Sequence, residues 1–268
     1  TLLQRSEGIL RDFPQRASDC IRNKLTEEGM IVKTGVSIEG MEEARDQTIR
    51  VVYRHKGVKE SIDTQFLFHA LGRKPATDRL NLKEIGVELQ ESGHVQTNSF
   101  QQTSISHIYA AGDCAGPHEI VHVAIRQGET AAFHALGKSV EAVTYDHLLG
   151  VVFTDPQVAI VGLLPAELRK RGIEFLSADY PFDDHGKSIL MEAKHGYVAV
   201  HAEKSTGVVL GAECVGKDAG ELIQTLSIAV SLKATVHQLA KADWYHPTLS
   251  EIWTYPLEDL AEEILEGS

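Results

Sequence analysis

Cysteine is scarce in this sequence, with three residues in 268: Cys20, Cys114 and Cys214. They form no Cys-x-x-Cys pair, no metal-ligand spacing and no even-numbered framework for disulfides. Such scarcity is typical of a reducing compartment, in which thiols pack as small apolar side chains. We therefore expect a cytoplasmic protein whose cysteines are packed and unpaired.

Long hydrophobic runs and an excess of basic charge are lacking as well. The longest apolar stretch, around residues 148–164, is interrupted by Asp155-Pro156-Gln157, whereas a membrane span needs about 18 apolar residues. The formal net charge is −12, from 26 basic and 38 acidic residues. Because such a surface repels nucleic acids and anionic lipids, we expect neither a nucleic-acid nor a membrane partner.

The composition is that of a globular protein, with 43% hydrophobic and 24% charged residues. The length suffices for one large domain or two ordinary ones. The chain begins Thr1-Leu2-Leu3, which resembles the middle of a strand and lacks an initiator methionine, so we expect the C-terminal part of a longer protein. The 13 histidines are scattered without ligand spacing, and no metal site is expected.

Hydrophobic periodicity predicts alternating strands and helices, followed after residue 145 by a block in which both are mixed. This block predicts an α+β unit, with helices packed on one face of an antiparallel sheet. The expected strands are residues 1–4, 30–37, 48–56, 61–70, 105–111, 151–154, 158–161, 195–201 and 208–215, with a short hairpin within 87–96. The expected helices are residues 16–28, 121–136 and 165–171, a long helix after the N-cap Asp218 and a short one after the N-cap Thr235.

The stretch "YAAGDC", residues 109–114, is the first of three that could carry chemistry. A buried strand that ends in Gly-Asp presents a carboxylate at the carboxyl end of a sheet, where doubly wound proteins bind ligands. Gly112 would let the backbone approach a ligand, and Asp113 would accept hydrogen bonds from its hydroxyls. The helix that begins near Val121 would direct its positive end at negative charge. An aspartate in a tight turn explains the same residues.

The second stretch, "LLQRSEGILRDF", residues 2–13, places Arg5 at a strand end and Arg11 six residues later. In Rossmann-type domains this place discriminates the ribose, and arginine suits a 2′-phosphate. No Gly-x-Gly-x-x-Gly precedes it. Two solvated arginines on an acidic protein account for the pattern at least as well.

The third stretch is "WYHPTLSE", residues 244–251. Thr248 and Glu251 form the Thr-x-x-Glu pattern of a helix capping box, and the local pattern alone favours this interpretation. Alternatively, Glu251 holds the ring of His246 in one tautomer and raises its basicity, so that the ring can transfer a proton. Both can hold together, because one carboxylate has two oxygens. A two-ligand metal site is disfavoured by the five-residue spacing, and Ser250 lacks the Gly-x-Ser-x-Gly elbow of a hydrolase.

Together these motifs resemble the pyridine nucleotide-disulfide oxidoreductases, the flavoprotein family of dihydrolipoamide dehydrogenase, glutathione reductase and mercuric reductase. The similarity lies in "LGRKPAT" (71–77), "TSISHIYAAGDCAG" (103–116) and "HPTLSE" (246–251), in the family's order and approximate spacing. In addition, "FTDPQVAIVGL" (153–163) and "GVVLGAECVGKDAGELI" (207–223) resemble its C-terminal interface domain. The resemblance covers essentially the whole chain.

The resemblance implies an α/β plus α+β fold, with partial doubly wound nucleotide-binding domains followed by an α+β dimerisation domain. Residues 1–70 would be part of an NAD(P)-binding domain and 71–142 the returning part of an FAD-binding domain. Residues 145–268 would form the interface domain of a homodimer. The implied cofactors are FAD and NAD(P)H, and the implied substrate is a small-molecule or protein-bound disulfide.

The resemblance also assigns roles to single residues. Asp113 would bind FAD along its ribityl and phosphate portion, and His122 would lie near the flavin ring. His246, held by Glu251, would be the acid/base that serves the thiols of the other subunit. The remaining implied cofactor-binding residues are Gly112, Gly72 and Arg73 for FAD, and Arg5 and Arg11 for NADPH.

The chain also departs from the family. It contains neither the FAD-binding Gly-x-Gly-x-x-Gly nor the redox-active Cys-x4-Cys, and Ala76 replaces the usual asparagine of "GRxPN". The C-terminal cysteine pair of mercuric reductase is missing, so that substrate is not expected. Trp244 and Tyr245 are bulkier than the small residues expected before the histidine. The alternative is therefore a dimerisation module without catalysis, which would be colourless when purified.

Overall fold

The computed structural model describes residues 1–44 and 47–266. Contacts divide the chain into two compact units, one formed by residues 1–67 and 146–268 and the other by residues 68–145. The sequence predicts separate domains for residues 1–70 and 145–268, whereas the contacts group residues 1–67 with residues 146–268. The division into three domains stays a prediction.

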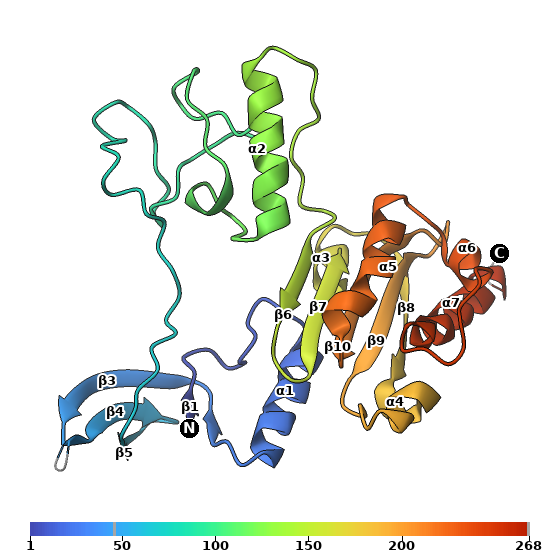
Figure 1. The fold of residues 1–268 in the computed structure, drawn as a ribbon, viewed down its shortest axis with the longest axis horizontal. Helices are drawn as coiled ribbons and strands as arrows, with labels where there is room; N and C mark the ends of the chain where they lie inside the picture. The colour runs from blue at the N-terminus through green and yellow to red at the C-terminus, as the bar shows by residue number, and fades with distance from the viewer. Residues whose placement is uncertain (45–46, 267–268) are drawn as a thin grey trace. The chain divides into compact units, whose positions relative to one another are not determined.

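A five-stranded antiparallel sheet forms the centre of the larger unit, with the order β6-β7-β10-β9-β8 (Figure 1). Alternate residues of β9, Val198, Val200 and Ala202, are fully buried on one face, as a two-residue period requires. A hairpin around residues 204–207 joins β9 to β10, the strands expected at residues 195–201 and 208–215. The strands are β6 (Leu149–Val152), β7 (Gln157–Gly162), β8 (Phe175–Pro181), β9 (Tyr197–Glu203) and β10 (Val209–Gly216).

Helices cover one face of this sheet and enclose the main core, as the sequence predicts. Trp253 is fully buried there, and its Nε1–H donates to the Leu222 carbonyl at 3.1 Å. The predicted N-cap Thr235 is confirmed, because its hydroxyl accepts the Gln238 N–H in a complete capping box. The helices after the sheet are α5 (Ala219–Ser231), α6 (Val236–Ala240), the 3-10 helix η4 (Ser250–Trp253) and α7 (Thr254–Glu266).

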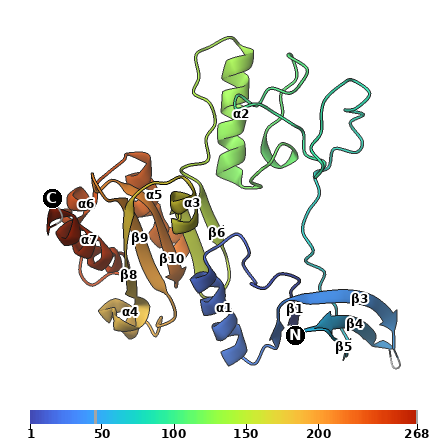
Figure 2. The ribbon, with the colours of Figure 1, turned by 180° about the vertical axis from the view of Figure 1, so that it is seen from behind.

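Helix α1 (Gln15–Glu27) packs against the sheet through a second, smaller core. Its Ile21 packs with Val158 and Tyr197, and Figure 2 shows α1 beside the strands. The Arg16 guanidinium lies 3.8 Å from the centroid of the Tyr197 ring and pairs with Asp179 at 2.7 Å. The helix predicted at residues 16–28 is therefore confirmed, and it joins the N-terminal segment to the sheet.

The remaining N-terminal strands form two small sheets. Strand β1 (Leu2–Leu3) pairs in parallel with β2 (Val32–Lys33). Strands β3 (Val36–Glu43), β4 (Ile49–His55) and β5 (Val58–Thr64) form an antiparallel sheet. The single strand expected at residues 30–37 is thus divided between two sheets, and the one expected at 61–70 ends early. Among the described strands, parallel pairing is limited to β1 and β2, so a doubly wound arrangement stays a prediction.

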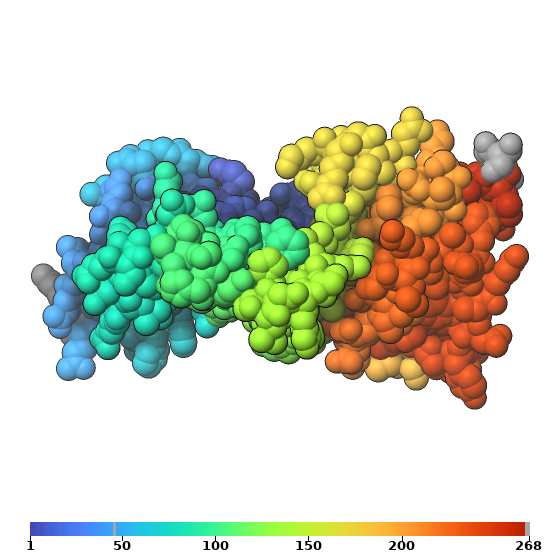
Figure 3. Space-filling view, turned by 90° about the horizontal axis from the view of Figure 1, so that it is seen from above, coloured from blue at the N-terminus to red at the C-terminus, as the bar shows by residue number. Residues whose placement is uncertain are grey.

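The smaller unit consists largely of turns and one long helix, α2 (Val121–Ala135), which confirms the helix expected there. The strand expected at residues 105–111 is wrong: the Ile108 N–H donates to the Ile105 carbonyl and closes a turn. A single bridge, between Gln102 and Tyr109, remains of it. The surface of this unit is cyan to yellow-green in Figure 3, and it includes the exposed apolar side chains of Val121 and Ile125.

Some elements differ from the expectation or were not expected. Asp218 precedes α5, but its backbone is left-handed, with φ +56°, and its side chain caps nothing. The N-cap geometry requires extended backbone, so the predicted cap is wrong. Strand β8 and the short helix α4 (Gly186–Leu190) were not anticipated. The helix predicted near Pro165 is confirmed as α3 (Pro165–Lys170).

Candidate functional site

His246 and Glu251 are brought together by the loop that leads into η4. The two residues after Glu251, Ile252 and Trp253, are fully buried, which anchors η4 in the main core. The Glu251 side chain is consequently held at 14% exposure, whereas the His246 ring is 81% exposed. The pair thus joins a fixed carboxylate to an imidazole that faces solvent.

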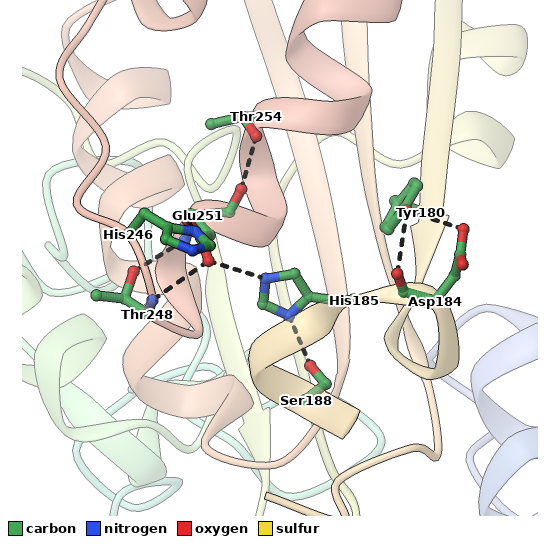
Figure 4. A network of polar contacts seen from close by, with 8 residues as sticks. All are labelled: Tyr180, Asp184, His185, Ser188, His246, Thr248, Glu251 and Thr254. Carbon is green, nitrogen blue, oxygen red and sulfur yellow. Dashed lines mark hydrogen bonds and ion pairs between the residues drawn. The ribbon is translucent and has the colours of Figure 1, made fainter. Parts of the chain in front are cut away.

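The two oxygens of Glu251 have different partners. His246 Nδ1 lies 2.9 Å from Oε2. Oε1 accepts the Thr248 N–H at 3.3 Å, and the Thr248 hydroxyl accepts the Glu251 N–H at 3.3 Å. The capping box and the histidine–carboxylate pair therefore exist together (Figure 4). Because a carboxylate only accepts, Nδ1 of His246 is the protonated nitrogen and Nε2 carries the exposed lone pair.

A second histidine, His185, lies behind the carboxylate. It is 1% exposed, and its Nε2 is 3.6 Å from Glu251 Oε1. Its Nδ1 lies 2.7 Å from the Ser188 hydroxyl, one helical turn further along. Burial lowers the pKa of His185, against the opposing effect of the Glu251 charge. Sequence reasoning missed this residue because the contact with Glu251 joins distant parts of the chain.

The Gly-Asp loop is held by one fully buried side chain in the smaller unit. Gln127 Oε1 accepts the Gly112 N–H at 2.7 Å, and Gln127 Nε2 donates to the Gly116 carbonyl at 2.8 Å. Gly112 has φ +77°, and a Cβ there would approach Ala124 Cβ at 3.3 Å, so glycine is required. Asp113 follows in the 3-10 helix η2 (Gly112–Cys114) and is exposed. The sequence analysis did not identify Gln127, although a polar residue in the buried stripe of α2 could have indicated a structural role.

The other residues expected near FAD lie around the same loop. Arg73 Nε is 3.8 Å from Glu119 Oε2, just before α2. Gly72 has φ +98° and is exposed. His122 is exposed near the start of α2. The smaller unit thus connects the "LGRKPAT" motif with the loop that carries Asp113.

The two arginines expected at the ribose are exposed on the segment between β1 and α1. Arg11 Nε pairs with Asp12 at 3.1 Å, so its charge is partly engaged. The joint role expected for Arg5 and Arg11 at a ribose stays a prediction.

Three general findings concern the described residues. They contain no group of three or more His, Cys, Asp or Glu side chains placed to hold a metal ion. Across the described ranges, no helix has the length and apolar character needed to cross a membrane. All three cysteines are free, and Cys214 is fully buried.

Comparisons with known proteins agree with this architecture. Residues 1–128 match the family "Pyridine nucleotide-disulphide oxidoreductase", and residues 149–256 match its dimerisation domain. The resemblance found in the sequence is therefore confirmed, and the chain belongs to the pyridine nucleotide-disulphide oxidoreductase family. It is a family of FAD- and NAD(P)H-dependent enzymes.

The chain is similar in sequence to dihydrolipoyl dehydrogenases. It is 31% identical over 252 residues to dihydrolipoyl dehydrogenase of Geobacillus stearothermophilus, covering 94% of this chain and 53% of that protein. It is 34% identical to the Thermus scotoductus enzyme of the same name, with 94% and 54% covered. The fold matches LpdA of Mycobacterium tuberculosis with a TM-score of 0.85 at 25% identity, over 96% of this chain and 55% of that one. The chain thus spans about half the length of the curated relatives it matches.

The similarity to a further solved structure concerns the fold alone. The HOCl-induced flavoprotein disulfide reductase RclA of Escherichia coli matches with a TM-score of 0.84 at 20% identity, over 96% of this chain and 58% of that one.

Proposed function

We propose that this chain acts in an FAD-dependent NAD(P)H:dithiol/disulfide oxidoreductase, with His246 as the thiol acid/base and Glu251 as its partner. The observation that carries the proposal is the 2.9 Å contact between His246 Nδ1 and Glu251 Oε2, together with the exposure of the ring. A capping box alone requires the Glu251 carboxylate, but it does not involve the His246 side chain.

The pair is built to move a proton at His246 Nε2. Glu251 fixes the Nδ1–H tautomer, so the lone pair of Nε2 is available to accept a thiol proton. The imidazolium that forms is stabilised by the carboxylate on its other side. When a thiolate attacks a disulfide, a new S–S bond forms and the other sulfur leaves as a thiolate, and the imidazolium can return the proton that converts this thiolate to a thiol.

The cofactor residues fit a flavin nucleotide in one respect. Gln127 fixes the Gly112 backbone while Asp113 stays exposed, which suits an acceptor for the hydroxyls of a bound ligand. FAD, when bound, supplies the transfer of electrons between a nicotinamide and a disulfide. Asp113 and Gly112 would orient its ribityl and phosphate portion, with Gly72, Arg73 and His122 on the same unit. Arg5 and Arg11 would favour the extra phosphate of NADPH.

The disulfide and the partner complete the proposal. The three cysteines of the chain are free, and burial raises the pKa of the fully buried Cys214. We therefore assign the disulfide served by His246 to a substrate or to a second subunit. The match of residues 149–256 to a dimerisation domain supports a homodimer formed through this part of the chain. A reducing compartment such as the cytoplasm suits its free thiols.

Replacing His246 with glutamine tests the proposal. In the His246→Gln variant of the intact enzyme, we expect disulfide turnover to fall by about 10²–10⁴-fold, the usual contribution of a general acid/base. Stopped-flow measurement of flavin reduction by NAD(P)H should give the rate of the unaltered protein. Unchanged disulfide turnover would refute the role of His246. A preparation without flavin absorbance would instead support the dimerisation module, which leaves the His246–Glu251 pair unexplained.

A further inference from the structure

His185 occupies a place that the proposed chemistry of His246 and Glu251 does not use. It precedes α4, follows the 3-10 helix η3 (Phe182–Asp184), and is almost completely buried. Among the described residues its Nε2 has no hydrogen-bond partner, although it is directed at Glu251 Oε1 from 3.6 Å. A buried polar atom without a partner is costly, so its orientation calls for an explanation.

The contacts with Ser188 and Glu251 together decide which nitrogen of His185 carries the proton. The Ser188 hydroxyl can either donate to Nδ1 or accept from it. If it accepted, His185 Nε2 would direct a lone pair at a carboxylate oxygen, which is repulsive. The favoured arrangement has Ser188 donating to Nδ1 and His185 directing Nε2–H at Glu251. Burial disfavours the doubly protonated ring, in agreement with its lowered pKa.

This N–H affects the carboxylate rather than the substrate. Oε1 of Glu251 has one other contact, the long bond from the Thr248 N–H at 3.3 Å. A second positive dipole at Oε1 opposes rotation of the carboxylate and keeps Oε2 directed at His246 Nδ1. Because the His246 ring is exposed, the orientation of Glu251 is the main restraint on its tautomer.

We propose that His185 is a positioning residue for this site: with Ser188 setting its tautomer, it holds the Glu251 carboxylate so that His246 keeps its Nδ1–H form. The proposal rests on the function proposed for His246 and deepens it. The arrangement is a row of four side chains in which only the last is exposed, Ser188, His185, Glu251 and His246 (Figure 4).

The described residues around His185 supply no competing partner for its Nε2. The edge of the His185 ring meets Tyr255 of α7, with centroids 6.2 Å apart. Tyr255 is stacked on Tyr180 of β8 at 3.7 Å, and the Tyr180 hydroxyl donates to Asp184 at 2.9 Å. The charged or titratable groups near the ring are therefore Glu251 and His246, with two tyrosines and an aspartate that are engaged with one another.

Histidine tautomers in the 268-residue chain test the proposal directly. The chain is labelled with ¹⁵N-histidine, and two-bond ¹H–¹⁵N spectra are recorded about two units above the ordinary histidine pKa of 6.5, where neutral rings predominate. Loss of signals in the His246→Gln and His185→Gln variants assigns the two rings. In the unaltered chain we expect His246 as Nδ1–H and His185 as Nε2–H.

Substitutions then separate positioning from simple packing. In His185→Leu the ratio of Nδ1–H to Nε2–H forms of His246 should fall by about fivefold, the change that one ordinary hydrogen bond makes in an equilibrium. His185→Gln keeps an N–H at the position of Nε2 and should restore the ratio. Ser188→Ala should lower it in the same direction, because the tautomer of His185 is no longer fixed.

His201 of β9 provides a matched control. It too is buried between a serine and a glutamate, with Ser177 at Nδ1 and Glu213 at Nε2, at 2.8 and 3.2 Å. His201→Leu should leave the His246 ratio unchanged, because it does not touch Glu251. If it lowers the ratio as much as His185→Leu, general loosening explains the effect and the proposal is overturned.

The remaining outcomes are also decisive. An unchanged His246 ratio in folded His185→Leu overturns the positioning role alone. If His185→Leu does not fold, finding His185 as Nδ1–H in the unaltered chain, or no effect of Ser188→Ala, overturns it instead. If His246 itself is not Nδ1–H in the unaltered chain, the pair with Glu251 is lost and the proposed function loses its support.

Discussion

Replacing Gln127 with leucine should loosen the Gly112 loop of the smaller unit. Gln127 is fully buried and holds three groups: the Gly112 N–H, the Gly116 carbonyl and the Tyr145 hydroxyl, all within 2.8 Å. Leucine keeps the approximate volume but leaves two buried backbone groups without partners. Each such group costs about 1–3 kcal/mol, so opening of the loop should become easier by at least ~2 kcal/mol.

Hydrogen exchange at the Gly112 amide measures this opening. A change of ~2 kcal/mol corresponds to about thirtyfold faster exchange, since each 1.4 kcal/mol is tenfold. Glu129→Leu is the control, because Glu129 is exposed on the same helix and the substitution adds the same side chain. Equal exchange at Gly112 in the unaltered chain and in Gln127→Leu would refute the claim that Gln127 holds the loop.

Two further predictions concern stability. Trp253 is fully buried and hydrogen-bonded to Leu222, so Trp253→Ala should lower the free energy of unfolding by about 3–5 kcal/mol, the range for large aromatic residues in cores. Urea denaturation measures this loss, and a loss below about 1 kcal/mol would contradict the core position of Trp253. Burial lowers the pKa of His185 and of His118, so their contribution to stability is complete above the unfolded-state pKa of about 6.5 and is lost as the pH falls below it. The fall in unfolding free energy between about pH 7.5 and 5.5 should be smaller in His185→Gln, and an equal fall would exclude His185 as a contributor.

Helices were predictable from the sequence where their own residues decide them. The apolar spacing of residues 16–28 and 121–136 is a local property, and the structure has α1 and α2 at these places. The capping box at Thr235 is likewise formed within four residues. The prediction failed at Asp218, because residue type does not reveal a left-handed backbone.

Strands were harder to predict, because a strand needs a partner that its own sequence does not specify. Residues 105–111 have the alternation of a strand, but the chain turns at Ile105 and keeps one bridge. The reverse occurs at β8, which alternates Leu176, Ala178 and Tyr180 and was missed. It lies at the edge of the sheet beside β9, and its own residues do not specify that partner.

The site followed the same division between local and distant contacts. His246 and Glu251 lie within one short motif, so their contact could be expected before the structure, although their catalytic role stays a proposal. His185 comes from the connection between η3 and α4, and no spacing in the sequence predicts its approach to Glu251.

The position of Glu251 on η4 explains how a helix cap and a histidine–carboxylate pair exist together. On an exposed helix end the carboxylate would be free to rotate, and neither of its two contacts would be held in place. Here Ile252 and Trp253 are buried immediately after it, which fixes the backbone of η4. The cap thus supports the pair, because the Thr248 N–H occupies Oε1 and leaves Oε2 to His246. Any substitution that frees η4 from the core should therefore weaken the cap and the His246 contact together.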